Sequence, residues 1–224
     1  MTSFLKIAVD GTSASGKGTL ARRLAQQFHL SYLDTGALYR AVAKHILDQG
    51  GNPDNEDDAL KSAIFVRDHF SWEMLEDPAI RTDIVADATS RSSQFPPLRE
   101  ALIEFQKNFA SHPPHKPSQK PWSGTILDGR DIGTIICPRA DVKFYCDAST
   151  ETRAQRRTKE LQEKGLNANL ETVLQEMIER DTRDQNRTKN PLKPAEDAII
   201  LDTTSLSADE VFEKACDIIR SKIA

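Results

Sequence analysis

The sequence has few cysteines and no long apolar run. Its three cysteines, Cys137, Cys146 and Cys216, are an odd number without a Cys-x-x-Cys pair. This favours buried free thiols in a reducing compartment over a disulfide framework. No apolar run approaches the length of a membrane span, and nothing like a signal peptide precedes the first apolar segment. We therefore expect a cytoplasmic protein that does not bind membranes.

Neither sign of charge dominates the chain. Thirty lysines and arginines are set against 34 aspartates and glutamates in 224 residues, a net charge of −4. This balance argues against a nucleic-acid or membrane-surface binder, whereas a small anionic ligand needs only a local basic cluster. A hydrophobic fraction of 38% and a charged fraction of 29% fit one sizeable α/β domain with room for a smaller inserted unit.

The strongest chemical signal is the glycine-rich segment 11–19, Gly-Thr-Ser-Ala-Ser-Gly-Lys-Gly-Thr. A glycine, four residues and then Gly-Lys is the phosphate-binding loop pattern. The glycines let backbone N–H groups turn inward, and Lys17 brings a positive charge to the outer phosphate oxygens. An apolar strand is expected at 5–10 and a helix at 17–28, whose positive N-terminal end would also face the anion.

One residue departs from the strict form of this loop. Gly18 follows the lysine where most such loops have serine or threonine, and the hydroxyl comes one place later, at Thr19. The Gly-Lys-Gly-Thr form is similar to that of nucleoside monophosphate kinases.

Apolar and helical patterns alternate along the rest of the chain. They predict an α/β fold of the phosphate-loop NTPase type, a parallel sheet flanked by helices on both faces. Strands are expected at 30–33, 125–128, 142–146 and 198–201, with a weaker one at 70–75. Helices are expected at 55–66, 82–92 and 98–109, and another begins at 34 and ends at the Gly-Gly-Asn-Pro turn at 50–53. A further helix would have the core residues Leu170, Val173, Leu174 and Met177, and the last one follows a capping box at 207–210.

The proline-rich segment 111–124 is expected to be an exposed loop. Its two histidines, His112 and His115, have no further metal ligands nearby in sequence. We therefore expect no metal site there.

Acidic residues follow several of the predicted strands. The ends of parallel strands meet at one rim of the sheet, so these residues should gather beside the phosphate loop. In the segment 128–133, Asp-Gly-Arg-Asp-Ile-Gly, two glycines flank an Arg-Asp pair and favour close approach of a ligand, although a turn closed by a local ion pair is the alternative. The acidic residues are Asp10, Asp34, Asp128, Asp131 and Asp147.

Two further groups of basic residues lie on predicted helices. Arg153, Arg156 and Arg157 have helical spacing, and Arg180, Asp184 and Arg187 share another stripe. Read alone, each group fits a solvated face with ion pairs. Beside a phosphate loop they are also candidates for a clamp, because phosphoryl transfer to a second phosphate brings two anions together.

Six segments, spread in order over nearly the whole chain, together resemble a bacterial-type cytidylate kinase. They are residues 10–19, 33–40, 95–102, 128–134, 161–165 and 179–187. The resemblance implies transfer of the γ-phosphoryl group of ATP to CMP or dCMP with Mg²⁺, by a cytoplasmic monomer. It also implies one kinase domain, with a core at 1–62, 96–150 and 168–224, a monophosphate-binding insert at about 63–95 and a lid at about 151–167.

The resemblance further implies roles for individual residues. The donor phosphates would lie on Gly11, Ser13, Ser15, Gly16, Lys17, Gly18 and Thr19, with Mg²⁺ at Thr19 and with Arg153 and Arg157 on the lid. Arg40, Arg130 and Arg187 would hold the acceptor phosphate and, with Lys17, form the catalytic set. Ser90, Arg99 and Asp131 would read the cytosine, Arg180 and Asp184 would bind the sugar, and Thr35 keeps a hydroxyl where many members have serine.

Three alternatives remain open at this stage. Another nucleoside monophosphate kinase, acting on UMP or AMP, would share the same loop. A GTPase-type switch would need Asn-Lys-x-Asp, and the nearest segment, 186–189, reads Asn-Arg-Thr-Lys. A nucleic-acid-binding module is disfavoured by the acidic balance.

Overall fold

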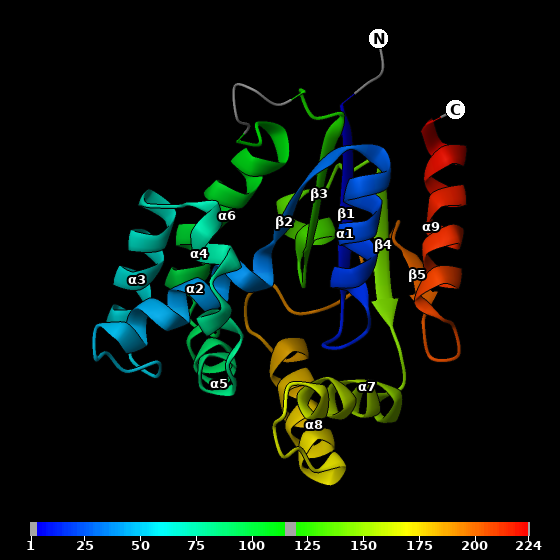
Figure 1. Cartoon of the computed structure of the whole chain (residues 1–224). Helices are drawn as coiled ribbons and strands as arrows, with labels where there is room; N and C mark the ends of the chain where they lie inside the picture. The colour runs from blue at the N-terminus through cyan, green and yellow to red at the C-terminus, as the bar shows by residue number, and fades with distance from the viewer. Residues whose placement is uncertain (1–3, 115–119, 224) are drawn as a thin grey trace. The chain divides into compact units, whose positions relative to one another are not determined.

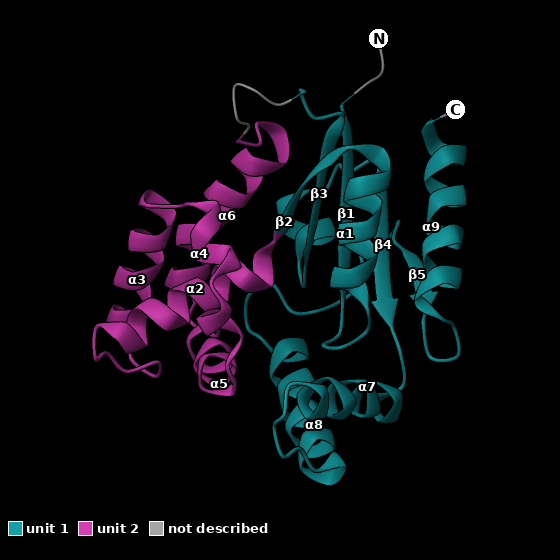
Figure 2. Cartoon of the chain, viewed as in Figure 1, with its two compact units in different colours: residues 1–33, 115–224 teal, residues 34–114 magenta. Residues whose placement is uncertain are grey.

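The computed structural model describes residues 4–114 and 120–223, which divide into two compact units. Unit 1 comprises residues up to 33 and those from 115 onward, and unit 2 comprises residues 34–114 (Figure 2). Each unit is described below by itself. The predicted insert at 63–95 lies within unit 2, which also includes helices on either side of it.

Unit 1 is built on a parallel sheet whose strand order is β2-β3-β1-β4-β5 (Figure 1). The strands are β1 Leu5–Gly11, β2 Leu30–Asp34, β3 Gly124–Gly129, β4 Val142–Asp147 and β5 Ile199–Asp202. The register pairs Asp10 with Gly129, Gly11 with Cys146 and Asp147 with Asp202. The carboxyl ends of four strands therefore meet at one rim.

Helices α1 (Lys17–Phe28) and α9 (Ala208–Ile223) pack against this sheet in one apolar cluster, with α1 in front of the strands in Figure 1 and α9 at the right. Leu20 and Leu24 of α1 pack with Val9, Phe144 and other strand residues in one apolar cluster, which α9 completes. The predicted helix at 17–28 and the capping box of α9 are confirmed. In the capping box, Ser207 Oγ accepts from the N–H of Glu210 and Glu210 Oε2 accepts from the N–H of Ser207.

Two further helices of unit 1 form a packed pair, α7 (Thr150–Glu163) and α8 (Leu170–Gln185). Ala154 and Leu161 of α7 meet Val173 and Met177 of α8 in a small apolar cluster. The prediction that Leu170 belongs to this core is wrong, because its side chain is 42% exposed at the start of α8.

Unit 2 is helical. It contains α2 (Thr35–Asp48), α3 (Glu56–Asp68), α4 (Trp72–Glu76), a 3₁₀ turn η1 (Pro78–Arg81), α5 (Asp83–Ser92) and α6 (Pro96–Ser111). Helix α3 packs against α2 and α6, and α5 packs against α2. Helices α3, α5 and α6 agree with the helices predicted at 55–66, 82–92 and 98–109, with acidic residues in the first turn of α3 and Pro-Pro at the start of α6.

The predicted strand at 70–75 is wrong, because helix α4 occupies this segment. Its aromatic residues pack as separate anchors instead of alternating across a sheet. Phe70 lies against Phe105, and Trp72 meets Phe109 edge-on, with ring centroids 4.7 and 5.8 Å apart. Packing against α6 thus overrides the β propensity of these residues.

Several other expectations can be compared with the described residues. All three cysteines are buried free thiols. No helix of the described residues is long and apolar enough to cross a membrane. His112 is exposed at the end of α6, and residues 4–114 and 120–223 contain no group of three or more histidine, cysteine, aspartate or glutamate side chains that could hold a metal ion. His115 and most of the proline-rich loop's centre lie outside the described residues.

Candidate active site

The loop between β1 and α1 has glycine at the two positions where its backbone requires one. Gly16, which precedes the first helical residue, has a left-handed φ of 86°, a conformation in which glycine carries no Cβ penalty. Gly11 approaches β4 so closely that an added Cβ would lie 2.0 Å from the carbonyl oxygen of Cys146. Both glycines of the motif are therefore dictated by the fold.

Lys17 lies over this loop, where the pattern requires a positive charge. Its Nζ donates to the carbonyl oxygen of Thr12 at 3.0 Å, and Ser15 Oγ donates to the same oxygen at 2.9 Å. The ammonium group thus lies at the mouth of the loop, next to the N-terminal end of α1, where an anion is favoured.

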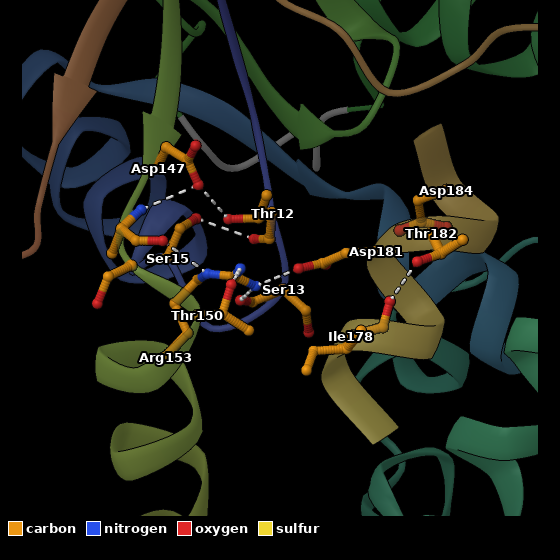
Figure 3. Close-up of polar contacts among 12 residues, drawn as sticks. Thr12, Ser13, Ser15, Asp147, Thr150, Arg153, Ile178, Asp181, Thr182 and Asp184 are labelled. Carbon is orange, nitrogen blue, oxygen red and sulfur yellow. Dashed lines mark hydrogen bonds and ion pairs between the residues drawn. The ribbon is translucent and has the colours of Figure 1, made fainter. Parts of the chain in front are cut away.

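The Thr12 side chain and the carbonyls of Ser13 and Ser15 are held by residues of neighbouring elements. Thr12 Oγ1 donates to Asp147 Oδ1 at 2.8 Å, and Asp147 itself ends β4 (Figure 3). The carbonyl of Ser13 accepts from Arg153 at 3.3 Å, and the carbonyl of Ser15 accepts from Thr203 Oγ1 at 3.0 Å.

Arg153 connects three segments of unit 1. Its side chain is only 4% exposed and forms an ion pair with Asp181 of α8 at 2.7 Å. It also donates to the carbonyl of Ala148 and to Thr150 Oγ1, at 2.9 and 3.0 Å (Figure 3). Arg153 is therefore anchored between α7, α8 and the phosphate loop.

The three arginines predicted to share one side of a helix, Arg153, Arg156 and Arg157, have different partners. Arg156 donates to both Thr203 Oγ1 and the Thr203 carbonyl, at 3.0 and 2.5 Å. Arg157 pairs with Glu160 on its own helix at 3.0 Å and is half-buried. Their helical spacing is confirmed, and Arg153 contacts the loop directly.

A second cluster forms around Asp184 near the end of α8. Arg130 Nε donates to Asp184 Oδ2 at 2.8 Å, and Arg187 Nη2 pairs with Asp184 Oδ1. Arg187 lies two residues beyond the end of α8, so the predicted helical stripe stops before it, yet the chain turns back to the same carboxylate. Arg180 is partly buried on α8, and its charge acts on Asp184.

The charge state of this cluster is well defined. Burial alone would raise the pKa of Asp184, but the positive charges of Arg130, Arg187 and Arg180 outweigh it and lower the pKa to about 2. The carboxylate is therefore ionised near neutral pH and holds both arginines as cations. Two guanidinium groups fixed in this way can bind one phosphate.

The acidic residue at the end of β1 positions the segment that follows β3. Asp10 Oδ1 and Oδ2 accept from the backbone N–H groups of Ile132 and Gly133, at 2.8 and 2.7 Å. Burial raises the pKa of Asp10 to about 6 despite these hydrogen bonds. The adjacent Asp131 side chain is buried at the start of the π-helical turn η2 (Ile132–Ile136).

Oxygen ligands suited to Mg²⁺ lie next to the start of α1. A Cβ added at Gly18 would be 3.2 Å from Asp128 Oδ2, so this carboxylate adjoins the turn that bears Thr19. Thr19 is exposed at this end of the helix. A hydroxyl and one carboxylate, completed by phosphate oxygens and water, fit the way proteins bind Mg²⁺.

The remaining predicted site residues lie in unit 2. Thr35 is buried at the first position of α2, with Asp34 as its N-cap, and Arg40 follows on the same helix. Arg99 is buried on α6, with its guanidinium 5.2 Å from the centroid of the Tyr39 ring. Ser90 is buried on α5.

Two contacts of the site were not anticipated from sequence. Asp181 has no local signal that marks it as the partner of Arg153, which is 28 positions away in the chain. Thr203 directly follows β5, so the rule that ligand sites lie beyond strand ends could have indicated it.

The parallel sheet and the loop between β1 and α1 define a nucleotide-binding protein of the phosphate-loop class. The cytidylate kinase family model matches residues 7–221. A cytidylate kinase of Paramagnetospirillum magneticum is 48% identical over 96% of this chain and 98% of its own length. One of Granulibacter bethesdensis is 45% identical, with 97% and 98% covered. The chain therefore belongs to the cytidylate kinase family, a family of phosphotransferases.

A solved structure agrees at the level of the fold. An uncharacterized protein from Eubacterium ventriosum superposes with a TM-score of 0.52 at 12% identity, covering 97% of this chain and 99% of that one. This likeness supports the α/β architecture alone.

Proposed function

We propose that the protein transfers the γ-phosphoryl group of ATP to CMP or dCMP, producing ADP and CDP or dCDP. The observation that carries this proposal is that two cations, Arg130 and Arg187, pair with Asp184 in the same unit as the phosphate loop. A kinase for an uncharged alcohol would have no use for two guanidinium groups held in this way, whereas a phosphate acceptor needs them.

The donor half of the site would lie on the phosphate loop. Inward backbone N–H groups and Lys17 would bind the phosphates of ATP, and Thr19 with Asp128 would hold Mg²⁺. When bound, the metal would neutralise charge on the β- and γ-phosphates. Arg157 of the lid would add charge from α7.

The acceptor half would use the residues that the cytidylate kinase resemblance indicates. Arg40, Arg130 and Arg187 would bind the acceptor phosphate, and Arg180 and Asp184 would bind the sugar hydroxyls. Ser90, Arg99 and Asp131 would read the base, with Thr35 nearby. The insert at 63–95 and the lid at 151–167 would close over a cytoplasmic, monomeric enzyme and exclude water from the transferring group.

Base selectivity has a simple physical source. Cytosine presents an amino donor and a ring acceptor, and uracil reverses both. A carboxylate at Asp131 and a donor at Arg99 suit cytosine and leave poor partners for uracil. The buried positions of both side chains make an unmatched polar group costly.

The test is a coupled ADP-release assay with ATP and Mg²⁺, offering CMP, dCMP, UMP, AMP and GMP side by side. Turnover with CMP and dCMP well above the other three supports the proposal. Preference for another monophosphate would overturn the base-reading residues and keep the phosphate chemistry. No turnover with any of them, together with binding of a labelled GTP analogue, would favour a nucleotide switch.

A further inference from the structure

The phosphate loop can bind phosphate only if its backbone N–H groups face inward. The residues that donate hydrogen bonds to the loop carbonyls can set this orientation. The peptides of the described residues are all trans, so the C=O and N–H of one peptide plane point in opposite directions. Any donor that holds a loop carbonyl outward therefore aims the next N–H inward. The carbonyls of Ser13 and Ser15 each have such a donor.

Thr203 is the donor for Ser15. Its hydroxyl lies 3.0 Å from the Ser15 carbonyl, and both residues are buried, with exposures of 3% and 0%. The peptide plane concerned is the one that carries the N–H of Gly16, the motif glycine just before α1. Loss of the hydroxyl would leave a buried carbonyl unsatisfied, which favours rotation of that plane.

Arg156 fixes the direction in which the hydroxyl donates. Its Nη1 donates to Thr203 Oγ1 and its Nη2 to the Thr203 carbonyl, at 3.0 and 2.5 Å. A hydroxyl that accepts from a guanidinium must turn its own hydrogen elsewhere, and it becomes a stronger donor. The backbone N–H of Thr203 donates to the carbonyl of Asp147 at 2.7 Å, which fixes the position of Thr203 beside the loop.

We propose that Thr203 and Arg156 are positioning residues that set the phosphate loop for the donor nucleotide, acting through the Ser15 carbonyl on the N–H of Gly16. Neither residue touches the reacting atoms in this arrangement. The inference rests on the proposed function only in taking ATP as the ligand of the loop.

The first test measures affinity for MgATP by titration calorimetry, without any acceptor. Thr203→Val keeps the shape of the side chain and removes the hydroxyl, and we expect about tenfold weaker binding. Thr203→Ser restores a hydroxyl and should bind within about twofold of wild type. Thr204→Val is the matched control, because the Thr204 hydroxyl accepts from the N–H of Ser149, whereas the Thr203 hydroxyl donates to a loop carbonyl.

The second test is a double-mutant cycle with Arg156→Met. This change alone should weaken MgATP binding, and adding it to Thr203→Val should weaken binding little further, because both act through one hydroxyl. The KM for CMP should stay within about twofold in every variant that turns over. Far-ultraviolet circular dichroism and thermal melting would show whether each variant is folded. If Thr203→Val does not fold, the comparison of Arg156→Met and Thr203→Ser with wild type carries the test.

The outcomes separate this inference from the proposed function. If wild type does not bind MgATP, the proposed function fails. If wild type binds and Thr203→Val binds equally well, or Thr203→Ser loses as much as Thr203→Val, the positioning role is overturned. An equal rise in the KM for CMP would also overturn it, since a general loss of structure moves both substrates.

Discussion

Asp184 is the side chain that pairs with both Arg130 and Arg187, the arginines proposed to bind the acceptor phosphate. Its folded pKa of about 2 lies below the ordinary value of 3.8, because the nearby arginines outweigh the effect of burial. A depressed carboxyl pKa contributes stability that is present above the unfolded pKa and is lost as pH falls through the folded one. The difference corresponds to about 2 kcal/mol, lost between about pH 4 and pH 2.

We therefore expect the stability gap between wild type and Asp184→Asn to be largest near neutral pH and to shrink below about pH 4. Urea unfolding at several pH values measures the gap. Asp217→Asn is the control, because the Asp217 pair with Arg220 is exposed and should contribute at most about 1 kcal/mol. A gap that stayed constant down to about pH 2 would contradict the assigned charge state.

Asp131 tests the proposed reading of the base. Asp131→Asn replaces one acceptor oxygen by a donor, so we expect CMP to lose and UMP to gain relative affinity. Loss of a charge-assisted hydrogen bond should lower kcat/KM for CMP roughly 10- to 100-fold. The KM for ATP should change little.

Steady-state kinetics with CMP, UMP and ATP as varied substrates would check this. Asp10 accepts hydrogen bonds from the backbone N–H groups of Ile132 and Gly133, next to Asp131. Because a change at Asp131 could disturb this segment, circular dichroism must first show that the variant keeps its fold. An unchanged ratio of CMP to UMP in a folded variant would refute the role.

At the scale of single elements, the cap of α3 offers a clean perturbation within unit 2. Asn55 Oδ1 accepts from the backbone N–H of Asp58 at 3.0 Å, which satisfies one of the unpaired donors of the first turn. Asn55→Ala should lower the free energy of unfolding by about 1 kcal/mol, and Asn55→Asp should retain most of it. The denaturant midpoint measures both, and an equal loss in the two variants would show that the cap is not responsible.

Elements whose signals are local could be predicted from sequence. The acidic start of α3 and the capping box of α9 each depend on residues within four positions of one another. Their hydrogen bonds form with little help from distant parts of the chain. The phosphate loop also has a local signature in its Gly-Lys spacing, although distant residues such as Arg153 and Thr203 hold its carbonyls. The acidic residues at the carboxyl ends of β1, β3 and β4 could be predicted because each comes at the end of an apolar run.

Contacts that depend on packing could not be predicted in this way. The segment at 70–75 is helical because its aromatic rings pack against α6, which the alternation pattern does not encode. Arg153 was expected to face phosphates, but only the packing of α7 on α8 reveals its ion pair with Asp181. The assignments of residues to ATP and CMP remain predictions that the variants above would test.

At the scale of the whole molecule, a net charge of −4 coexists with clustered arginines in unit 1. Arg130, Arg153 and Arg187 each pair with a buried or nearly buried aspartate of α8. The aspartates keep the arginines oriented while compensating their charge, so a local group of basic side chains does not require a basic protein.

The proposed donor site also predicts how the whole chain responds to its ligand. A ligand that binds only the folded state at about 100 times its dissociation constant adds about 2.7 kcal/mol of stability. For a chain of this size that corresponds to a rise in melting temperature of roughly 5–10 °C. Wild type with MgATP should show this rise, and Lys17→Ala should lose most of it together with turnover, because the ammonium at the mouth of the loop is gone. Asn55→Ala should melt lower in both states but keep the full rise, since its change lies in unit 2. Differential scanning calorimetry measures the melting temperatures. An equal rise in melting temperature for Lys17→Ala and wild type would mean that the phosphate loop is not where ATP binds.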